Sequence, residues 1–212
     1  KDDFWVKYND LTNLMGEISI AIQSGLDISN MGTLIADSSH FSKEIIEGLK
    51  NIKAYEAKVQ YVMKNYKGEE IEETKQWYSA DKGVRVEFGD EVTKVYKDEK
   101  IYVKDTINDN EYELGQDMDI VHPLAFINNI LAYPIREGSI SEGQEEWGDT
   151  IYIKADVELF LNNIYFNKAT IFIDKKNRVP IGIVVYDRED RYVLKIIYEQ
   201  FEEVEKIDDS LL

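Results

Sequence analysis

The sequence predicts an α+β protein built on a large curled antiparallel sheet, a half-barrel with helices covering one face. Residues 54–104 provide the first evidence, because apolar and polar side chains alternate there in runs separated by short turns. Residues 151–202 repeat this pattern. Short connections between such runs make neighbouring strands antiparallel. A sheet of roughly nine to eleven strands cannot stay flat, so we expect it to curl around a concave side.

Turn residues separate the predicted strands. In the first half they lie at residues 67–68, 81–83, 89–90 and 98–99. Such residues fit tight hairpin turns, so residues 54–104 are expected to form a five-strand meander. A short further strand is expected at Glu111–Leu114. In the second half the predicted strands span residues 151–161, 168–174, 179–186 and 191–202.

Three helices are expected beside the sheet. Asp10 can cap the first, Gly25 can end it, and residues 25–37 are expected to be a linker. The second can begin at Ser38, Ser39 or Ser42. Its apolar stripe comprises Phe41, Ile45, Ile46, Leu49 and Ile52. Pro123 begins a third, largely apolar helix that runs to Leu131 and must lie against a sheet face.

These elements divide the chain into three parts. They are a helical extension at residues 1–37, a half-barrel domain at residues 38–204 and an acidic tail at residues 205–212, which is expected to fray. The chain begins at Lys1 without a methionine, so we expect a trimmed form whose secretion signal would lie upstream. No apolar run is long enough to cross a membrane.

The composition excludes several classes of function. Acidic residues number 42 and basic residues 25, which gives a formal net charge of −17. Such a chain repels phosphate backbones and anionic lipid, so we expect no nucleic-acid partner and no charge-driven membrane docking. The absence of cysteine excludes disulfides, zinc–thiolate sites and a cysteine nucleophile.

No catalytic or metal-binding pattern is present, so we expect a protein that is not an enzyme and holds no cofactor. The two histidines, His40 and His122, lack zinc-site spacing, and we expect the first to be exposed and the second to cap a helix. Residues 138–143 are flanked by glycine but lack the spacing of a nucleophile elbow. The acidic cluster at residues 105–111 fails the register of a calcium loop, and we expect a solvated loop there.

Large aromatic side chains are the candidates for partner binding. Trp77, Tyr78 and Trp147 lie on or beside predicted strands with polar neighbours. Exposed aromatics are favoured anchors for protein partners, although each of these could instead pack under a helix. A sheet edge is a second candidate surface, because it can accept a strand from another chain. The N-terminal segment also makes a homodimer by segment exchange a hypothesis.

The order of the elements resembles a known family. The segments that carry the resemblance are Tyr55-x-Ala57-x-Val59-x-Tyr61, Lys82–Phe88, Thr93–Val103, the short helix Pro123–Leu131 and the late hairpin Ala169–Tyr186. Over residues 41–202 this arrangement is similar to the lipoprotein-carrier fold of LolA, LolB and LppX, in which the short helix is a lid. Within that group the chain is similar to the clostridial germination lipoproteins of the GerS type.

The resemblance implies an exported spore-envelope lipoprotein, anchored through a cysteine upstream of this chain. It also implies a partner, a zinc-dependent peptidoglycan amidase (CwlD-like) that trims the spore cortex on the way to muramic-lactam, which germination requires. In that system the lipoprotein is the activator and the amidase performs the chemistry. Membrane contact would then be made only through the lipid anchor.

A carrier of lipid or lipoprotein acyl chains in the concave face is the alternative function. A contiguous apolar lining would favour the carrier, whereas scattered charge or collapsed packing would favour a binding protein. Glu73 and Lys75 share a strand face with Trp77, and Lys94 shares one with Tyr96. Charges on a cavity wall are costly, so these positions favour the binding protein.

Overall fold

The computed structural model describes residues 31–145, 148–161 and 163–212 of the chain. The chain comprises two compact units, Lys1–Phe41 and Ser42–Leu212. The helix predicted between Asp10 and Gly25 lies outside the described residues. Helix α2 (Met31–Lys50) begins earlier than predicted, so residues 31–37 are helical and are not a linker. A single glycine, Gly32, is tolerated in a helix at a cost of about 1 kcal/mol.

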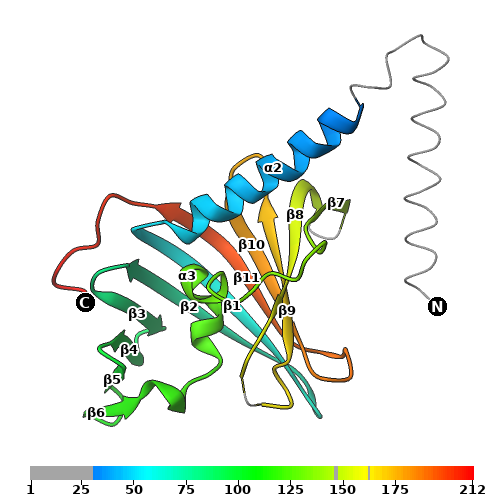
Figure 1. The fold of residues 1–212 in the computed structure, drawn as a ribbon. Coiled ribbons are helices and arrows are strands. Elements are labelled where there is room, and N and C mark those ends of the chain that lie inside the picture. Colours follow the sequence, from blue (N-terminus) through cyan, green and yellow to red (C-terminus); the bar gives the residue numbers. More distant parts are fainter. Residues whose placement is uncertain (1–30, 146–147, 162) are drawn as a thin grey trace. The chain divides into compact units, whose positions relative to one another are not determined.

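Within the described residues, eleven strands form a single antiparallel sheet in the second unit (Figure 1). The strands are β1 (Ala54–Asn65), β2 (Gly68–Ser79), β3 (Gly83–Phe88), β4 (Val92–Lys97), β5 (Lys100–Asp105), β6 (Asn110–Gly115), β7 (Ser141–Glu145), β8 (Gly148–Glu158), β9 (Lys168–Asp174), β10 (Val179–Tyr186) and β11 (Tyr192–Glu203). The predicted half-barrel is therefore confirmed.

The sheet consists of two meanders that meet at β1 and β11. Its strand order is β6-β5-β4-β3-β2-β1-β11-β10-β9-β8-β7, so β6 and β7 are the two edges and the barrel is not closed. The central pair places Tyr55 opposite Glu203 and Met63 opposite Leu194, with a register shift between Lys58 and Val59. Such irregularities bend a strand and increase its twist, which helps this large sheet to curl.

Strand β7 is the element that the sequence did not predict. Its residues, Ser-Glu-Gly-Gln-Glu, carry no apolar alternation. It nevertheless pairs with β8, placing Ser141 opposite Lys154 and Gly143 opposite Tyr152. Backbone pairing with a strong neighbouring strand therefore substitutes for the missing pattern.

The segment between the two meanders forms a lid on the inner face of the sheet. It contains the 3₁₀ turns η2 (Gln116–Met118) and η3 (His122–Ala125) and the one-turn helix α3 (Ile127–Ile130), which Figure 1 shows inside the curve. The prediction of one continuous helix from Pro123 to Leu131 is wrong. Phe126 has extended backbone (φ −77°, ψ 108°), and its ring packs edge-on against Tyr96 at 5.1 Å.

The acidic tail does not fray, contrary to the expectation from sequence. The side chain of Ile207 is 2% exposed. Arg85 Nη1 donates a hydrogen bond to the carbonyl oxygen of Leu211 at 3.3 Å, and Lys82 pairs with Asp209. The tail is therefore held against the β2–β3 hairpin. No helix in the described part of the chain is long and apolar enough to span a bilayer.

Candidate functional site

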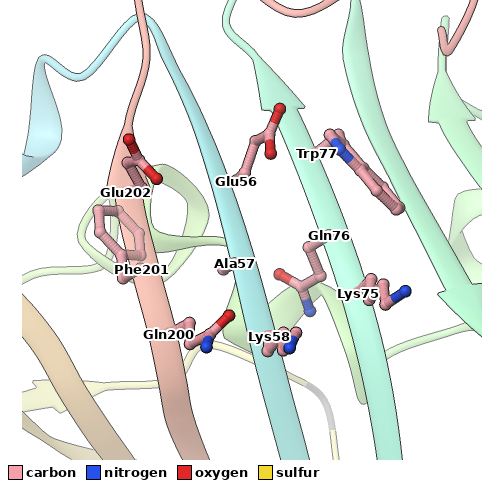
Figure 2. Close-up of a pocket in the computed structure, with 9 residues that line it drawn as sticks. All are labelled: Glu56, Ala57, Lys58, Lys75, Gln76, Trp77, Gln200, Phe201 and Glu202. Carbon is pink, nitrogen blue, oxygen red and sulfur yellow. The ribbon is translucent and has the colours of Figure 1, made fainter.

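A shallow hollow of about 470 Å³ lies on the outer face of the sheet, over β1, β2 and β11 (Figure 2). Alternation along the strands places every second side chain on this face. The residues that line the hollow are Glu56, Ala57, Lys58, Lys75, Gln76, Trp77, Gln200, Phe201 and Glu202. The register shift between β1 and β11 falls beside Lys58, at the edge of this hollow.

The residues that line the hollow carry no net formal charge, although the chain as a whole is strongly acidic. The charged side chains of the hollow are Glu56, Glu202, Lys58 and Lys75, so its formal charge is zero, whereas the chain carries −17. Among the ion pairs of the described residues, none joins these four side chains to one another. They therefore present both donors and acceptors to a partner, as the polar rim of a protein interface does.

The three aromatic residues predicted to bind a partner do not form one surface. Trp77 lies on the outer face and borders the hollow, and Figure 2 shows its indole on the side of β2 that faces away from β1. Tyr78 points to the inner face, where its ring stacks on Tyr55 at 4.9 Å. Burial, with the nearby charge of Asp81, raises the pKa of Tyr78. Trp147 lies outside the described residues.

A partly buried polar cluster, which sequence reasoning missed, fixes the lid to the sheet. Asp119 Oδ2 accepts hydrogen bonds from Lys94 Nζ at 3.0 Å, Tyr96 Oη at 2.6 Å and His122 Nδ1 at 2.7 Å. His122 Nε2 lies 2.8 Å from Glu72 Oε2. Its ring also packs edge-on against Tyr61 and Phe88. The signal available in the sequence was Lys94, a cation on an otherwise apolar strand face.

The surroundings of the two titratable groups at the centre of this cluster favour the charged form of each. Burial disfavours the charged form of Asp119, but hydrogen bonds from His122, Tyr96 and Lys94 and the charge of His122 hold its pKa well below the usual range. Burial likewise lowers the pKa of His122, but its bonds to Asp119 and Glu72 outweigh burial and raise that pKa above the ordinary value. Each ring nitrogen faces a carboxylate, an arrangement that favours the doubly protonated ring.

We expect replacement of His122 by glutamine to be most costly at acidic pH. The pKa of His122 is higher in the folded than in the unfolded chain, so its stabilisation is complete below about pH 6.5 and is lost as pH rises through the folded pKa. The measurement is urea unfolding of both proteins from pH 5 to pH 9. The difference in free energy, about 1–3 kcal/mol at the acidic end, should shrink with rising pH.

The matched control is His40→Gln, which replaces the other histidine in the described chain. It should change the free energy of unfolding by about 0.5 kcal/mol or less, because His40 is exposed on helix α2. A His122→Gln difference that stays constant across this range would show that the imidazolium charge does not hold the lid.

The lid fills the inner face with apolar side chains. Ile127, Ile130 and Leu131 are fully buried, and Leu124 and Phe126 are at most 5% exposed. Three tyrosines of the sheet meet the lid backbone: Tyr55 Oη accepts from Ile127 N, whereas Tyr61 Oη and Tyr198 Oη donate to the carbonyl oxygens of His122 and Ala125. The side chains of the lid therefore fill the concave face of the sheet.

Among the described residues, no group of three or more histidine, aspartate, glutamate or cysteine side chains could hold a metal ion. The loop at residues 105–111 is organised by its own backbone, since Asp105 Oδ1 accepts from the backbone N–H groups of Ile107 and Asn108. The carboxylate therefore already serves as a turn cap.

Comparison with known proteins identifies the family. The sequence pattern of the family described as sporulation protein YdcC-like matches residues 18–212. The chain belongs to this family. No curated protein matches it in sequence. The predicted link to sporulation is confirmed.

Three solved structures are similar to this chain at low sequence identity, and the first of them, with a TM-score above 0.5, supports the fold. An uncharacterized conserved protein from Thermus thermophilus is 12% identical, with 82% of this chain and 92% of that chain covered, at a TM-score of 0.53. The LolA superfamily protein NE2245 from Nitrosomonas europaea is 10% identical, with coverage of 81% and 97% and a TM-score of 0.41. A chain of the complex of the CwlD amidase from Clostridioides difficile with the GerS lipoprotein is 16% identical, with coverage of 78% and 92% and a TM-score of 0.39.

Proposed function

We propose that this sporulation protein is a non-catalytic activator that binds a zinc-dependent, cortex-modifying peptidoglycan amidase of the CwlD type. Membership of the YdcC-like family supports a role in spore formation. The partner class follows from the resemblance of the sequence to the GerS-type lipoproteins. In this proposal the protein is exported and lipid-anchored in the spore envelope, and a homodimer by segment exchange stays a prediction.

The observation that carries the proposal is the packed lid. A carrier needs an apolar concave face open to its cargo, but here the lid side chains occupy the inner face and are almost fully buried. The Asp119 cluster, formed by Glu72, Lys94, Tyr96, Asp119 and His122, fixes the lid at one end. Collapsed packing on the inner face favours a binding protein that uses its outer surfaces.

Activation then has a simple thermodynamic form. An activator works by binding the competent state of its partner more tightly than the incompetent state. If the competent amidase is the zinc-loaded one, zinc and activator must strengthen each other's binding by the same factor. The outer hollow with Trp77 is the proposed contact, because large aromatic side chains bordered by polar groups dominate many protein interfaces.

The experiment is calorimetric titration of the chain with purified amidase, with and without zinc. We expect binding that tightens when zinc is present. Trp77→Ala is expected to weaken the association by about 2 kcal/mol or more, the loss that is typical of an interface hot spot.

The matched control is Tyr102→Ala, which removes another aromatic side chain from the outer face of the same half of the sheet. Tyr102 is 37% exposed and lies on β5, away from the hollow. It should leave the affinity unchanged. Absence of binding with and without zinc would refute the amidase proposal, whereas equal losses in the two variants would refute only the contact at Trp77.

A further inference from the structure

The most exposed aromatic side chains of the described residues gather at one end of the sheet. Tyr66 is 91% exposed, Phe160 75% and Tyr165 61%. Tyr66 lies in the turn between β1 and β2, where Asn65 pairs with Gly68. Phe160 and Tyr165 lie in the connection from β8 to β9, which begins where Glu158 pairs with Lys168. Figure 1 shows both loops at the lower end of the sheet.

The turn between β10 and β11 joins these two loops into one surface. Arg188 N donates a hydrogen bond to the carbonyl oxygen of Ile164 at 3.4 Å, which connects that turn to the β8–β9 loop. At the start of β11, Tyr192 Oη bonds to Glu69 of β2. We call this surface the aromatic end and define it by Tyr66, Phe160, Ile164 and Tyr165. Ile164 is itself 53% exposed.

The aromatic end is almost neutral, unlike the rest of the chain. Residues 63–70, 158–168 and 187–192 contain five basic and six acidic residues, so their formal charge is −1 against −17 for the whole chain. Two of the cations lie over aromatic rings. Lys67 Nζ is 5.4 Å from the centre of the Tyr66 ring, and Lys64 Nζ is 4.8 Å from that of Tyr192.

We propose that the aromatic end docks directly on a zwitterionic phospholipid surface. Its exposed side chains come from two loops, Tyr66 from one and the other three from the β8–β9 connection, and a fluid lipid interface accepts such side chains without a matching protein shape. Tyrosine and lysine suit that interface, because each has an apolar body that can enter the lipid and a polar tip that stays in water. A protein partner would instead favour a contiguous, closely packed core.

The charge balance identifies which lipid surface fits. The net charge of −17 would repel an anionic bilayer at long range, and the aromatic end carries no cationic excess to offset that repulsion. A zwitterionic surface exerts no such repulsion, so insertion of the aromatic side chains can drive binding alone. Binding should therefore survive high salt, which screens charge but does not weaken the burial of apolar surface.

The test is flotation of the 212-residue chain, carrying no lipid, with phosphatidylcholine vesicles in low salt and in about 0.5 M NaCl. We expect the chain to float with the vesicles at both salt concentrations. The triple variant Tyr66→Ser, Phe160→Ser and Tyr165→Ser should lower the partition coefficient by about tenfold or more, because apolar burial drives interfacial binding. Circular dichroism confirms that both proteins are folded.

The control triple variant changes exposed apolar side chains elsewhere on the sheet: Tyr102→Ser, Tyr112→Ser and Ile151→Ser, at positions 37%, 42% and 51% exposed. It should float as the unmodified chain does. Three results would each overturn the proposal. They are failure of the unmodified chain to float, an equal loss of binding in the two triple variants, and binding that requires phosphatidylglycerol and disappears in salt. Loss of amidase affinity without loss of flotation in the first triple variant would identify the aromatic end as a protein interface.

Discussion

Replacing Asp119 by alanine is expected to lower the free energy of unfolding by about 3 kcal/mol, as removal of one member of a buried charged network does. The side chain of Asp119 is 9% exposed, and that of Lys94 is 22% exposed. Without the carboxylate, Lys94 and His122 lose the group that pairs with them, and Tyr96 Oη loses its acceptor. The measurement is urea unfolding near pH 6, below the ordinary pKa of histidine, which the cluster raises further for His122.

Asp105→Ala is the matched control, because the two aspartates play the same local role. Asp119 Oδ1 lies 3.2 Å from the backbone N atoms of Val121 and His122, and Asp105 Oδ1 lies 3.0 and 3.1 Å from those of Ile107 and Asn108. Asp105 ends β5 beside an exposed loop, and the only further hydrogen bond of its side chain in the described residues is an exposed one from Asn108 Nδ2, so its loss should cost about 1 kcal/mol or less. Equal costs in the two variants would show that the bonds between the lid and β4 add nothing to stability.

The sequence predicted the strands well because most of them carry a regular pattern. In β1, Tyr55, Val59 and Tyr61 alternate with polar residues, and all three are at most 1% exposed. Strands β9 and β10 have the predicted bounds. Strand β7 lacks any such pattern, and its position depends on pairing with β8, which no local signal in its own residues reveals.

The sequence did not reveal which face of β2 is buried. Alternation placed Trp77 with Glu73 and Lys75 on one face, and this face was interpreted as a cavity wall. The structure places that face outside and buries the polar one instead. Thr74 Oγ1 donates to the carbonyl oxygen of Val59 at 3.0 Å, and Gln76 Nε2 donates to Tyr61 Oη at 2.8 Å. Hydrogen bonds to β1 thus offset part of the cost of burying these two polar side chains, although Gln76 Oε1 stays without a partner among the described residues. Only the tertiary structure shows these bonds.

For Lys94 on β4, in contrast to β2, the sequence indicated the correct face of the strand. Its strand face was correctly interpreted as an inner face that carries a charge, yet no sequence pattern indicated a partner for it. The partner is Asp119, which is distant in sequence and belongs to a lid segment without regular periodicity. The same lid supplies His122, which was expected only to cap a helix. A site built from two segments separated by several strands depends on the curl of the sheet, and alternation patterns alone do not determine that curl.

Replacing Gly83 by alanine is expected to cost about 2–5 kcal/mol of stability, from two separate effects. The residue has φ of +112°, a conformation that costs a side chain about 1–2 kcal/mol. A methyl group there would also collide with the backbone carbonyl oxygen of Tyr96, and overpacking typically costs about 1–3 kcal/mol. The measurement is the midpoint and slope of urea unfolding.

Two further glycines separate these effects. Gly68→Ala has a similar constraint, with φ of +139°, but its methyl would meet no atom within 4 Å, so it should show the cost of strain alone. Gly48→Ala has neither problem and lies within helix α2, where alanine should stabilise by up to about 1 kcal/mol. If Gly83→Ala costs no more than Gly68→Ala, the β3–β4 pair can move away from the methyl group. A larger cost means that the pairing of Val84 with Tyr96 holds these strands in place, and with them Tyr96 as a donor to Asp119.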